Sequence, residues 1–178
     1  MINIKNLNIT IILTLLFIGC EKDTTSNVEP INDISGRSSW KIIQQEILDK
    51  SCAGCHSVGT SFGNQSELIL TADVAYENLI NREPHNQAAK DDGLELVGTE
   101  GLGSLYKSYL WEKINAPDKD HFYADHPQYG EIMPLGMDFL TNGQLEFIRQ
   151  WIVAGAPEAG GVADSLLLQD SVRFVDVL

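Results

Sequence analysis

Cys52, Cys55 and His56 lie together in the segment CAGCH, which brings two thiols and an imidazole into one short stretch of chain. Two cysteines separated by two residues can close a disulfide loop, supply half of a zinc site or anchor a haem. The histidine that directly follows the second cysteine helps to distinguish these possibilities, because each makes a different demand on the rest of the chain.

The interpretations without haem explain this motif incompletely. A disulfide gives His56 no role, and a thioredoxin-like site requires a preceding strand where the sequence predicts a helix. A zinc site needs four ligands, and the chain has no second CxxC pair to supply them. The remaining histidines are His85, His121 and His126. Zinc therefore stays open as an alternative.

A covalently bound haem uses every residue of the motif. In C-x-x-C-H the two thiols form thioether bonds with the porphyrin vinyl groups, and the histidine coordinates the iron. Gly54 between the cysteines lets both sulfurs reach adjacent edges of the ring. The motif predicts one haem c, attached through Cys52 and Cys55, with His56 as the proximal iron ligand.

The N-terminus is typical of an export signal, and this haem is attached outside the cytoplasm. Lys5 precedes the apolar run LNITIILTLLFIG, which has the length of a signal-peptide core and is short for a membrane span. Cys20 follows this run directly, an arrangement that resembles the lipobox of bacterial lipoproteins with Phe17 in place of the usual leucine. We predict a signal peptide over 1–19 and lipid on Cys20, with an ordinary signal peptide or anchor as the alternative. The protein is then exported and lipid-anchored, on the periplasmic or outer face of a bacterial membrane.

The charge of the chain restricts its partners. Its 12 Lys and Arg against 25 Asp and Glu give a net charge of -13, which argues against a nucleic-acid partner. An acidic surface suits a soluble domain that meets basic proteins. Residues 20–37 are polar without apolar periodicity and are predicted to be a flexible tether, followed by the folded domain over 38–157. Residues 158–178 form an extension whose structure the sequence leaves open.

The periodicity of apolar residues predicts an all-α fold with long loops. Helices are expected over about 40–50, 72–81 and 105–115, and a fourth runs from Thr141 to Gly155. No convincing sheet is predicted. Loops of this length in a small domain usually indicate disorder or wrapping around something, and a bulky buried cofactor would supply the core that such loops do not build.

The ends of three helices carry recognisable capping residues. Ser39 and Thr71 are the expected N-caps of the first two helices. Thr141 and Gln144 form a capping-box pattern at the start of the fourth helix, and Gly155 stands where a C-cap glycine belongs.

Two segments make the chain resemble the monohaem cytochrome c family, in a divergent branch of exported bacterial proteins. IIQQEILDKSCAGCH is similar to the family's N-terminal helix and haem motif, and MPLGMDFLTNGQLEFIRQWIVAGAP is similar to its C-terminal part. The segments DVAYENLINREP and GSLYKSYLWEKI resemble the divergent branch, and the whole resemblance covers about 38–157. It implies cytochrome c-like helices wrapped around one covalently bound haem, with Met133 as the distal iron ligand. Met137 is the substitute, and His121 or His126 would give a bis-histidine haem.

The resemblance implies an electron carrier, not an enzyme, and the acidic surface suits redox partners with basic docking surfaces. The alternatives are a five-coordinate haem enzyme or sensor for peroxide or a diatomic gas, and a fixed haem subunit of a respiratory complex. The family also implies that the first and last helices pack together. The contacting faces would be Trp40, Ile43 and Ile47 against Leu145, Ile148 and Ile152. Four aromatic residues are suited either to line a porphyrin or to fill the core: Tyr106, Tyr109, Trp111 and Trp151.

Overall fold

The structure is a computed structural model that describes residues 34–175. Its first helical segment is a continuous run that leads directly into Cys52. The run consists of α1 (Ser39–Ile42), a π-helix η1 (Ile43–Leu48) and α2 (Asp49–Ser51), which confirms the helix predicted over 40–50. Its N-cap is Ser38, whose Oγ accepts a hydrogen bond from the Lys41 N–H at 3.2 Å, so the prediction of Ser39 as the cap is wrong. The buried residues of η1 include one polar side chain, that of Gln44.

Short helices fill the middle of the chain, where the sequence predicted two longer ones. They are α3 (Ser61–Ser66), α4 (Ala75–Leu79), α5 (Gln87–Asp91), α6 (Leu102–Leu105), α7 (Tyr109–Ile114), η2 (Ala116–Asp118) and α8 (Lys119–Asp125). The helix expected over 72–81 is shortened to α4, whose N-cap is Val74 without a side-chain cap, so Thr71 is not its cap. The helix expected over 105–115 is split into α6 and α7.

The split between α6 and α7 has a tertiary cause at Ser108. The buried Ser108 Oγ donates to Ser104 O at 2.6 Å and accepts from the Gly98 N–H at 3.1 Å. The Tyr109 N–H donates to Glu95 O at 2.7 Å and the Glu95 N–H donates to Lys107 O at 3.0 Å, which pairs Glu95 with Ser108 in an isolated parallel bridge. Pairing with the distant segment around residue 95 overrides the local helical periodicity.

Helix α9 (Asn142–Val153) is the longest helix of the described region, and it agrees with the prediction. Both bonds of the capping box are present, because Thr141 Oγ1 accepts from the Gln144 N–H and Gln144 Oε1 accepts from the Thr141 N–H. The predicted contact face of Leu145, Ile148 and Ile152 is buried, and Gly155 adopts a φ of 89° just past the end of the helix.

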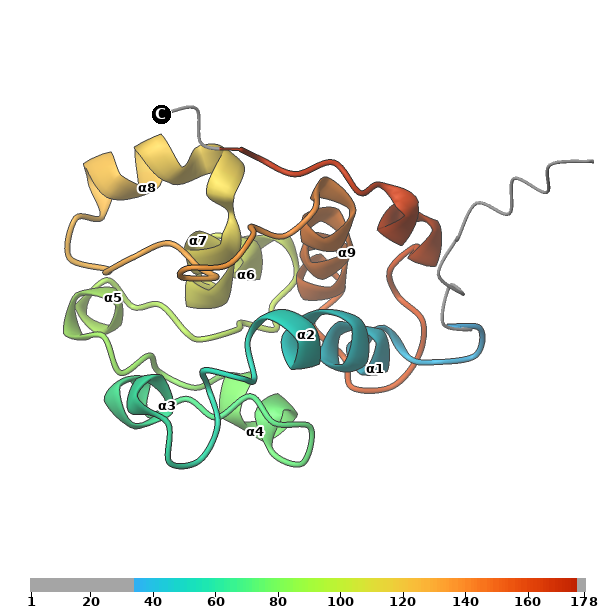
Figure 1. Ribbon diagram of the computed structural model, residues 1–178, viewed down its shortest axis with the longest axis horizontal. Helices are drawn as coiled ribbons and strands as arrows, with labels where there is room; N and C mark the ends of the chain where they lie inside the picture. Colours follow the sequence, from blue (N-terminus) through green and yellow to red (C-terminus); the bar gives the residue numbers. More distant parts are fainter. Residues whose placement is uncertain (1–33, 176–178) are drawn as a thin grey trace, which may run out of the picture. The chain divides into compact units, whose positions relative to one another are not determined.

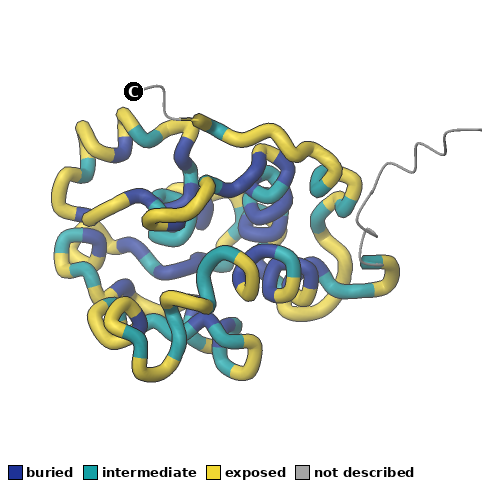
Figure 2. Tube along the Cα trace, viewed as in Figure 1, coloured by how far each residue is buried: buried dark blue, intermediate teal, exposed yellow. Residues whose placement is uncertain are grey.

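The main hydrophobic core lies where the first helical run meets α9, as Figure 2 shows by the buried positions along both. The Trp40 ring stacks on the Trp151 ring with centroids 5.4 Å apart, and the predicted contact faces belong to one cluster. A second, smaller cluster is built around Phe122, Tyr129 and Ile132. Tyr109 packs against both clusters.

The chain after α9 returns across the domain. It forms η3 (Ser165–Gln169), which packs on α9, and then runs past the start of α9 toward α8 (Figure 1).

Residues 34–175 contain isolated β-bridges but no strand, so the all-α class is confirmed. Within this range no helix has the length and apolarity to cross a membrane. The predicted signal peptide and Cys20 lie outside the described residues. Ile34, which was assigned to the tether, packs against the main core.

Candidate functional site

The CAGCH motif forms a turn at the C-terminal end of α2. The N–H groups of Cys55 and His56 both donate to Cys52 O, at 3.1 and 3.0 Å. Cys52 is half-buried and packs against the main core, whereas Cys55 is exposed, and both are free thiols. One sulfur is therefore anchored to the fold and the other faces outward from the same turn.

Thr60 and Gly63, which follow the motif, hold this turn against the start of α3. The single hydroxyl proton of Thr60 is shared between Cys55 O and Ser57 O, and Thr60 Oγ1 accepts from the Gly63 N–H at 3.0 Å as the cap of α3. A Cβ at Gly63 would collide with Ser57 O and lie 2.8 Å from Thr60 Oγ1, so only glycine permits this approach. The turn that carries the motif is thus fixed by its immediate neighbours in sequence.

The hydrogen bonds around His56 determine which ring nitrogen carries the proton. His56 Nδ1 lies 3.3 Å from Leu68 O and 3.2 Å from Ser66 Oγ. Ser66 donates its hydroxyl proton to Phe62 O at 2.6 Å, so toward His56 its oxygen acts as an acceptor. Because both neighbours of Nδ1 are acceptors, Nδ1 is protonated, and the lone pair of the neutral ring is on Nε2. A histidine held in this way presents Nε2 as a metal ligand.

The backbone of His56 is also tied to the helix before the motif. His56 O accepts from the Leu70 N–H at 2.8 Å, and Leu70 O accepts from Gln44 Nε2 at 3.0 Å. Gln44 is only 4% exposed and also donates to Asp49 Oδ1 at 2.7 Å. We did not single out Gln44 or Ser66 from the sequence. The available signal for Gln44 was its place among the apolar residues of the first helix, four residues after Trp40.

The electrostatics of the motif argue against thiol–disulfide exchange and leave His56 neutral, as a metal ligand must be. Burial, followed by the charge of Cys55, raises the pKa of Cys52 to about 12, which keeps this thiol protonated at neutral pH. Reactive thiols of redox CxxC motifs have lowered pKa values, so the structure argues against that alternative. Burial lowers the pKa of His56, partly opposed by its bond to Leu68, so the ring is neutral at neutral pH.

Met133 lies in the loop between α8 and α9 and packs against the same core as Cys52. Its N–H donates to Lys113 O in α7 at 2.6 Å, and the Met133–Pro134 peptide bond is cis. Met133 is half-buried, whereas Met137 in the same loop is 51% exposed. A ligand must be held by its surroundings, so the structure favours Met133 over Met137.

The other histidines are engaged outside the motif. His85 pairs with Glu67 at 3.5 Å, and His121 pairs with Asp125 at 2.9 Å. His126 stacks on Tyr129, with ring centroids 4.3 Å apart. Within residues 34–175, no three or more His, Cys, Asp and Glu side chains are grouped as a metal site. The zinc alternative therefore lacks its further ligands in this region.

The four aromatic candidates for lining a porphyrin separate into two pairs. Trp151 is completely buried in the main core and donates its indole N–H to Pro157 O, and Tyr106 is 71% exposed. Neither side chain is positioned to line a porphyrin. Tyr109 and Trp111 are half-buried at the edge of the core and remain suitable.

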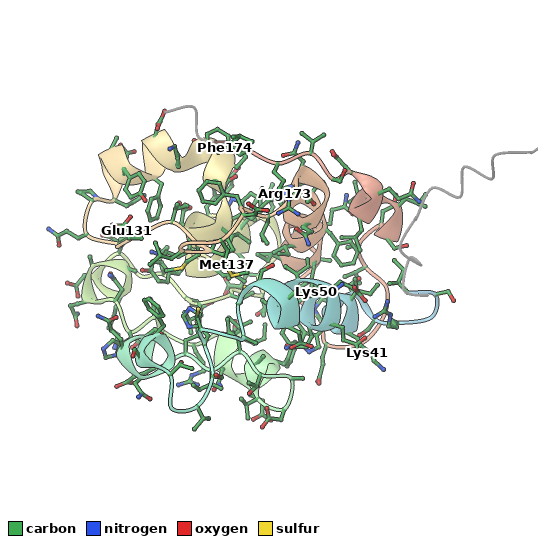
Figure 3. All side chains as sticks on the ribbon, viewed as in Figure 1. Lys41, Lys50, Glu131, Met137, Arg173 and Phe174 are labelled. Atoms are coloured by element: carbon green, nitrogen blue, oxygen red, sulfur yellow. The ribbon has the colours of Figure 1, made fainter. Side chains whose placement is uncertain are left out.

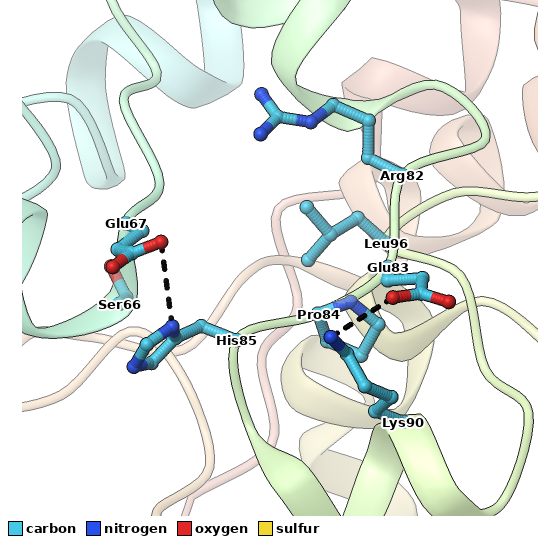
Figure 4. Close-up of a pocket in the computed structure, with 8 residues that line it drawn as sticks. All are labelled: Ser66, Glu67, Arg82, Glu83, Pro84, His85, Lys90 and Leu96. Carbon is cyan, nitrogen blue, oxygen red and sulfur yellow. Dashed lines mark ion pairs between the residues drawn. The ribbon is translucent and has the colours of Figure 1, made fainter.

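A pocket of about 350 Å³ is lined in part by Ser66 and Glu67, which follow the motif at the end of α3 (Figure 4). Ser66 belongs both to this pocket and to the hydrogen bonds at His56 Nδ1. The lining also carries two ion pairs, His85 with Glu67 and Lys90 with Glu83. Such a charged lining does not suit the apolar face of a porphyrin, and the pocket shares Ser66 with Nδ1 of His56, not with the nitrogen that would bind iron. We therefore do not assign a haem to it.

The motif residues fit a covalently bound haem. Two free thiols flank one turn, and the next residue is a neutral histidine with Nε2 left for iron. No protein-family model matches the chain, and neither a curated protein nor a solved structure matches it. The function must therefore be inferred from the geometry of the site.

Proposed function

We propose that this protein is an exported, lipid-anchored cytochrome c with a single haem that carries electrons outside the cytoplasm. Cys52 and Cys55 hold the haem covalently, and His56 and Met133 are the two iron ligands. The observation that carries the proposal is the pair of acceptors at His56 Nδ1, which leaves Nε2 for iron directly after two free thiols. The bound haem supplies a one-electron change between ferrous and ferric iron.

The chain's own residues hold the ligands still. His56 is oriented through Nδ1 by Leu68 O and through its backbone by Leu70. The backbone of Met133 is fixed to Lys113 in α7. Rigid ligands favour rapid electron transfer, because little structural change accompanies the change in oxidation state. A thioether ligand also raises the reduction potential.

The surface charge favours transient binding to a basic partner. A net charge of -13 steers a positively charged protein toward this chain, and the attraction is screened by salt. Apolar side chains near both ligands add contact surface, since Val58 is 84% exposed and Leu135 is 47% exposed. Lipid on Cys20 would keep this encounter close to the membrane.

The test is expression of the full chain with the covalent-haem maturation machinery of a bacterial periplasm. We expect a protein that keeps one haem after denaturation, takes up one electron reversibly and reacts more slowly with a basic redox protein as salt is raised. The ferrous protein should not bind carbon monoxide readily. Rapid carbon monoxide binding would identify the five-coordinate enzyme or sensor instead, and absence of covalent haem would overturn the proposal.

A further inference from the structure

The segment after α9, residues 158–175, is here called the C-terminal strap, and it is attached to the domain at three places. The first attachment is Ser39 at the start of α1. The buried Ser39 Oγ accepts from the N–H groups of Val162 and Ala163 at 2.9 and 3.0 Å, and the Ser39 N–H donates to Gly160 O at 2.9 Å. This attachment explains why Ser39 is buried and does not cap the helix.

The second attachment is the first turn of α9, at Gly143. A Cβ built at Gly143 would collide with Leu167 O and lie 2.8 Å from Asp170 O, both backbone atoms of the strap. Alanine normally stabilises a helix position relative to glycine by about 1 kcal/mol. The glycine is therefore explained by the close approach of the strap, which leaves no room for a side chain.

The third attachment is the loop that carries Met133, at its junction with α9. The Asn142 N–H donates to Val172 O at 2.7 Å, and Thr141 forms an antiparallel bridge with Arg173. The centroids of the Phe174 and Phe139 rings lie 6.1 Å apart. Lys119 Nζ lies over the Phe174 ring, 5.6 Å from its centroid. Figure 3 shows Arg173 and Phe174 on the side of the domain where this loop and α8 meet.

The contacts of the third attachment differ in strength. Arg173 pairs with Asp138 at 3.2 Å, but their side chains are 42% and 85% exposed, and exposed ion pairs contribute little. Phe174 is half-buried, and the backbone bond at Asn142 is independent of side-chain charge. The aromatic contact and the backbone pairing therefore carry most of the attachment.

We propose that the C-terminal strap positions the Met133 loop, so that Met133 binds iron firmly only while the strap is seated on Gly143 and Phe139. Gly143 and Phe174 are positioning residues in this arrangement. The backbone of the loop is fixed at Met133 itself by Lys113 O, and its end at Thr141 is fixed by α9 and the strap. Releasing that end lets the loop move the thioether away. This inference rests on the proposed function, because it concerns ligation of the haem iron.

The test compares two pairs of variants in the haem-loaded full chain. Gly143→Ala forces the strap off α9, and its matched control is Gly103→Ala in α6, where an added Cβ meets nothing within 4 Å. Phe174→Ala removes the aromatic contact, and its control is Val175→Ala, which is 71% exposed. The measurements are covalent haem content, the methionine-to-ferric-iron absorption band, and the affinity for imidazole, which competes with methionine.

We expect all four variants to retain covalent haem. Gly143→Ala should bind imidazole at least ten times more tightly than Gly103→Ala and lose most of the methionine band, and Phe174→Ala should show a several-fold effect. If Gly143→Ala fails to fold, Phe174→Ala decides the result. Equal imidazole affinity in variants and controls, with haem attached, would overturn this inference alone. Absence of covalent haem from the unaltered protein would overturn the proposed function, and this inference with it.

Discussion

The two sides of the candidate haem site are built in different ways. Around His56 the contacts are local, because Ser66, Leu68 and Leu70 follow it closely in the sequence. Around Met133 they are long-range, since the loop is held by Lys113 on one side and by the C-terminal strap on the other. Contacts between residues that are close in sequence close short loops, whereas those that hold the Met133 loop close long ones at a greater cost in entropy. The methionine side is therefore the side expected to open first.

The largest effect should come from removing the anchors on the histidine side. In Cys52→Ser/Cys55→Ser we expect complete loss of covalently held haem, because a hydroxyl does not form the thioether bond. The measurement is the haem that stays with the protein after denaturation and acid extraction. Cys20→Ser is the control, and it should keep the haem while losing membrane association. Haem retained by the double variant would show that other residues attach it.

Opening the methionine side alone should leave the haem attached. Met133→Ala should convert a protein that resists carbon monoxide into one that binds it rapidly in the ferrous state. Met137→Ala is the matched control in the same loop, and because Met137 is 51% exposed it should behave like the unaltered protein. The opposite result for the two variants would assign the ligand to Met137. The measurement is the rate of the spectral change on mixing with carbon monoxide.

The buried Lys113 should make stability rise with pH. Burial lowers its pKa from 10.5 to about 8, partly opposed by Glu131. Between these values the unfolded chain binds more protons than the folded one, so the free energy of unfolding increases with pH, by at most about 1.4 kcal/mol per pH unit. Above pH 10 Tyr109 acts in the opposite direction, because burial raises its pKa to about 12.

Denaturant unfolding of the haem-loaded protein between pH 7.5 and 9.5 measures this dependence, since its cysteines no longer titrate. Lys113→Met should flatten the rise. An equal slope in the unaltered protein and in Lys113→Met would contradict the assignment to this lysine.

The smallest effect should come from one hydrogen bond on the histidine side. Ser66→Ala removes one of the two acceptors at His56 Nδ1, and Leu68 O remains to hold the proton there. We expect a loss of about 1 kcal/mol in the free energy of unfolding, with haem content and iron ligands unchanged. Ser61→Ala, at an exposed position of the same helix, should cost less. A change of iron ligand in Ser66→Ala would mean that Leu68 O alone does not orient the ring.

The same contrast explains which features could be predicted from the sequence. The capping box at Thr141 and the turn at CAGCH depend on neighbours in the chain, and both are visible in short patterns. The break before α7 depends on the pairing of Ser108 with Gly98 and Glu95, and no helical or capping pattern reports this pairing.

No short sequence pattern predicts that position 143 must be glycine. The requirement comes from the backbone of the strap, more than twenty residues further along the chain. Where contacts are long-range, periodicity predicts that a helix exists but neither its ends nor its partners.

The central claim is that His56 and Met133 coordinate the same haem iron. Proton NMR of the reduced, haem-loaded protein tests it most directly. A methionine methyl group bound to haem iron is shifted far upfield by the ring current of the porphyrin. We predict one such three-proton signal in the unaltered protein, retained in Met137→Ala and absent from Met133→Ala. Absence of the signal from the unaltered protein, or its persistence in Met133→Ala, would contradict the account.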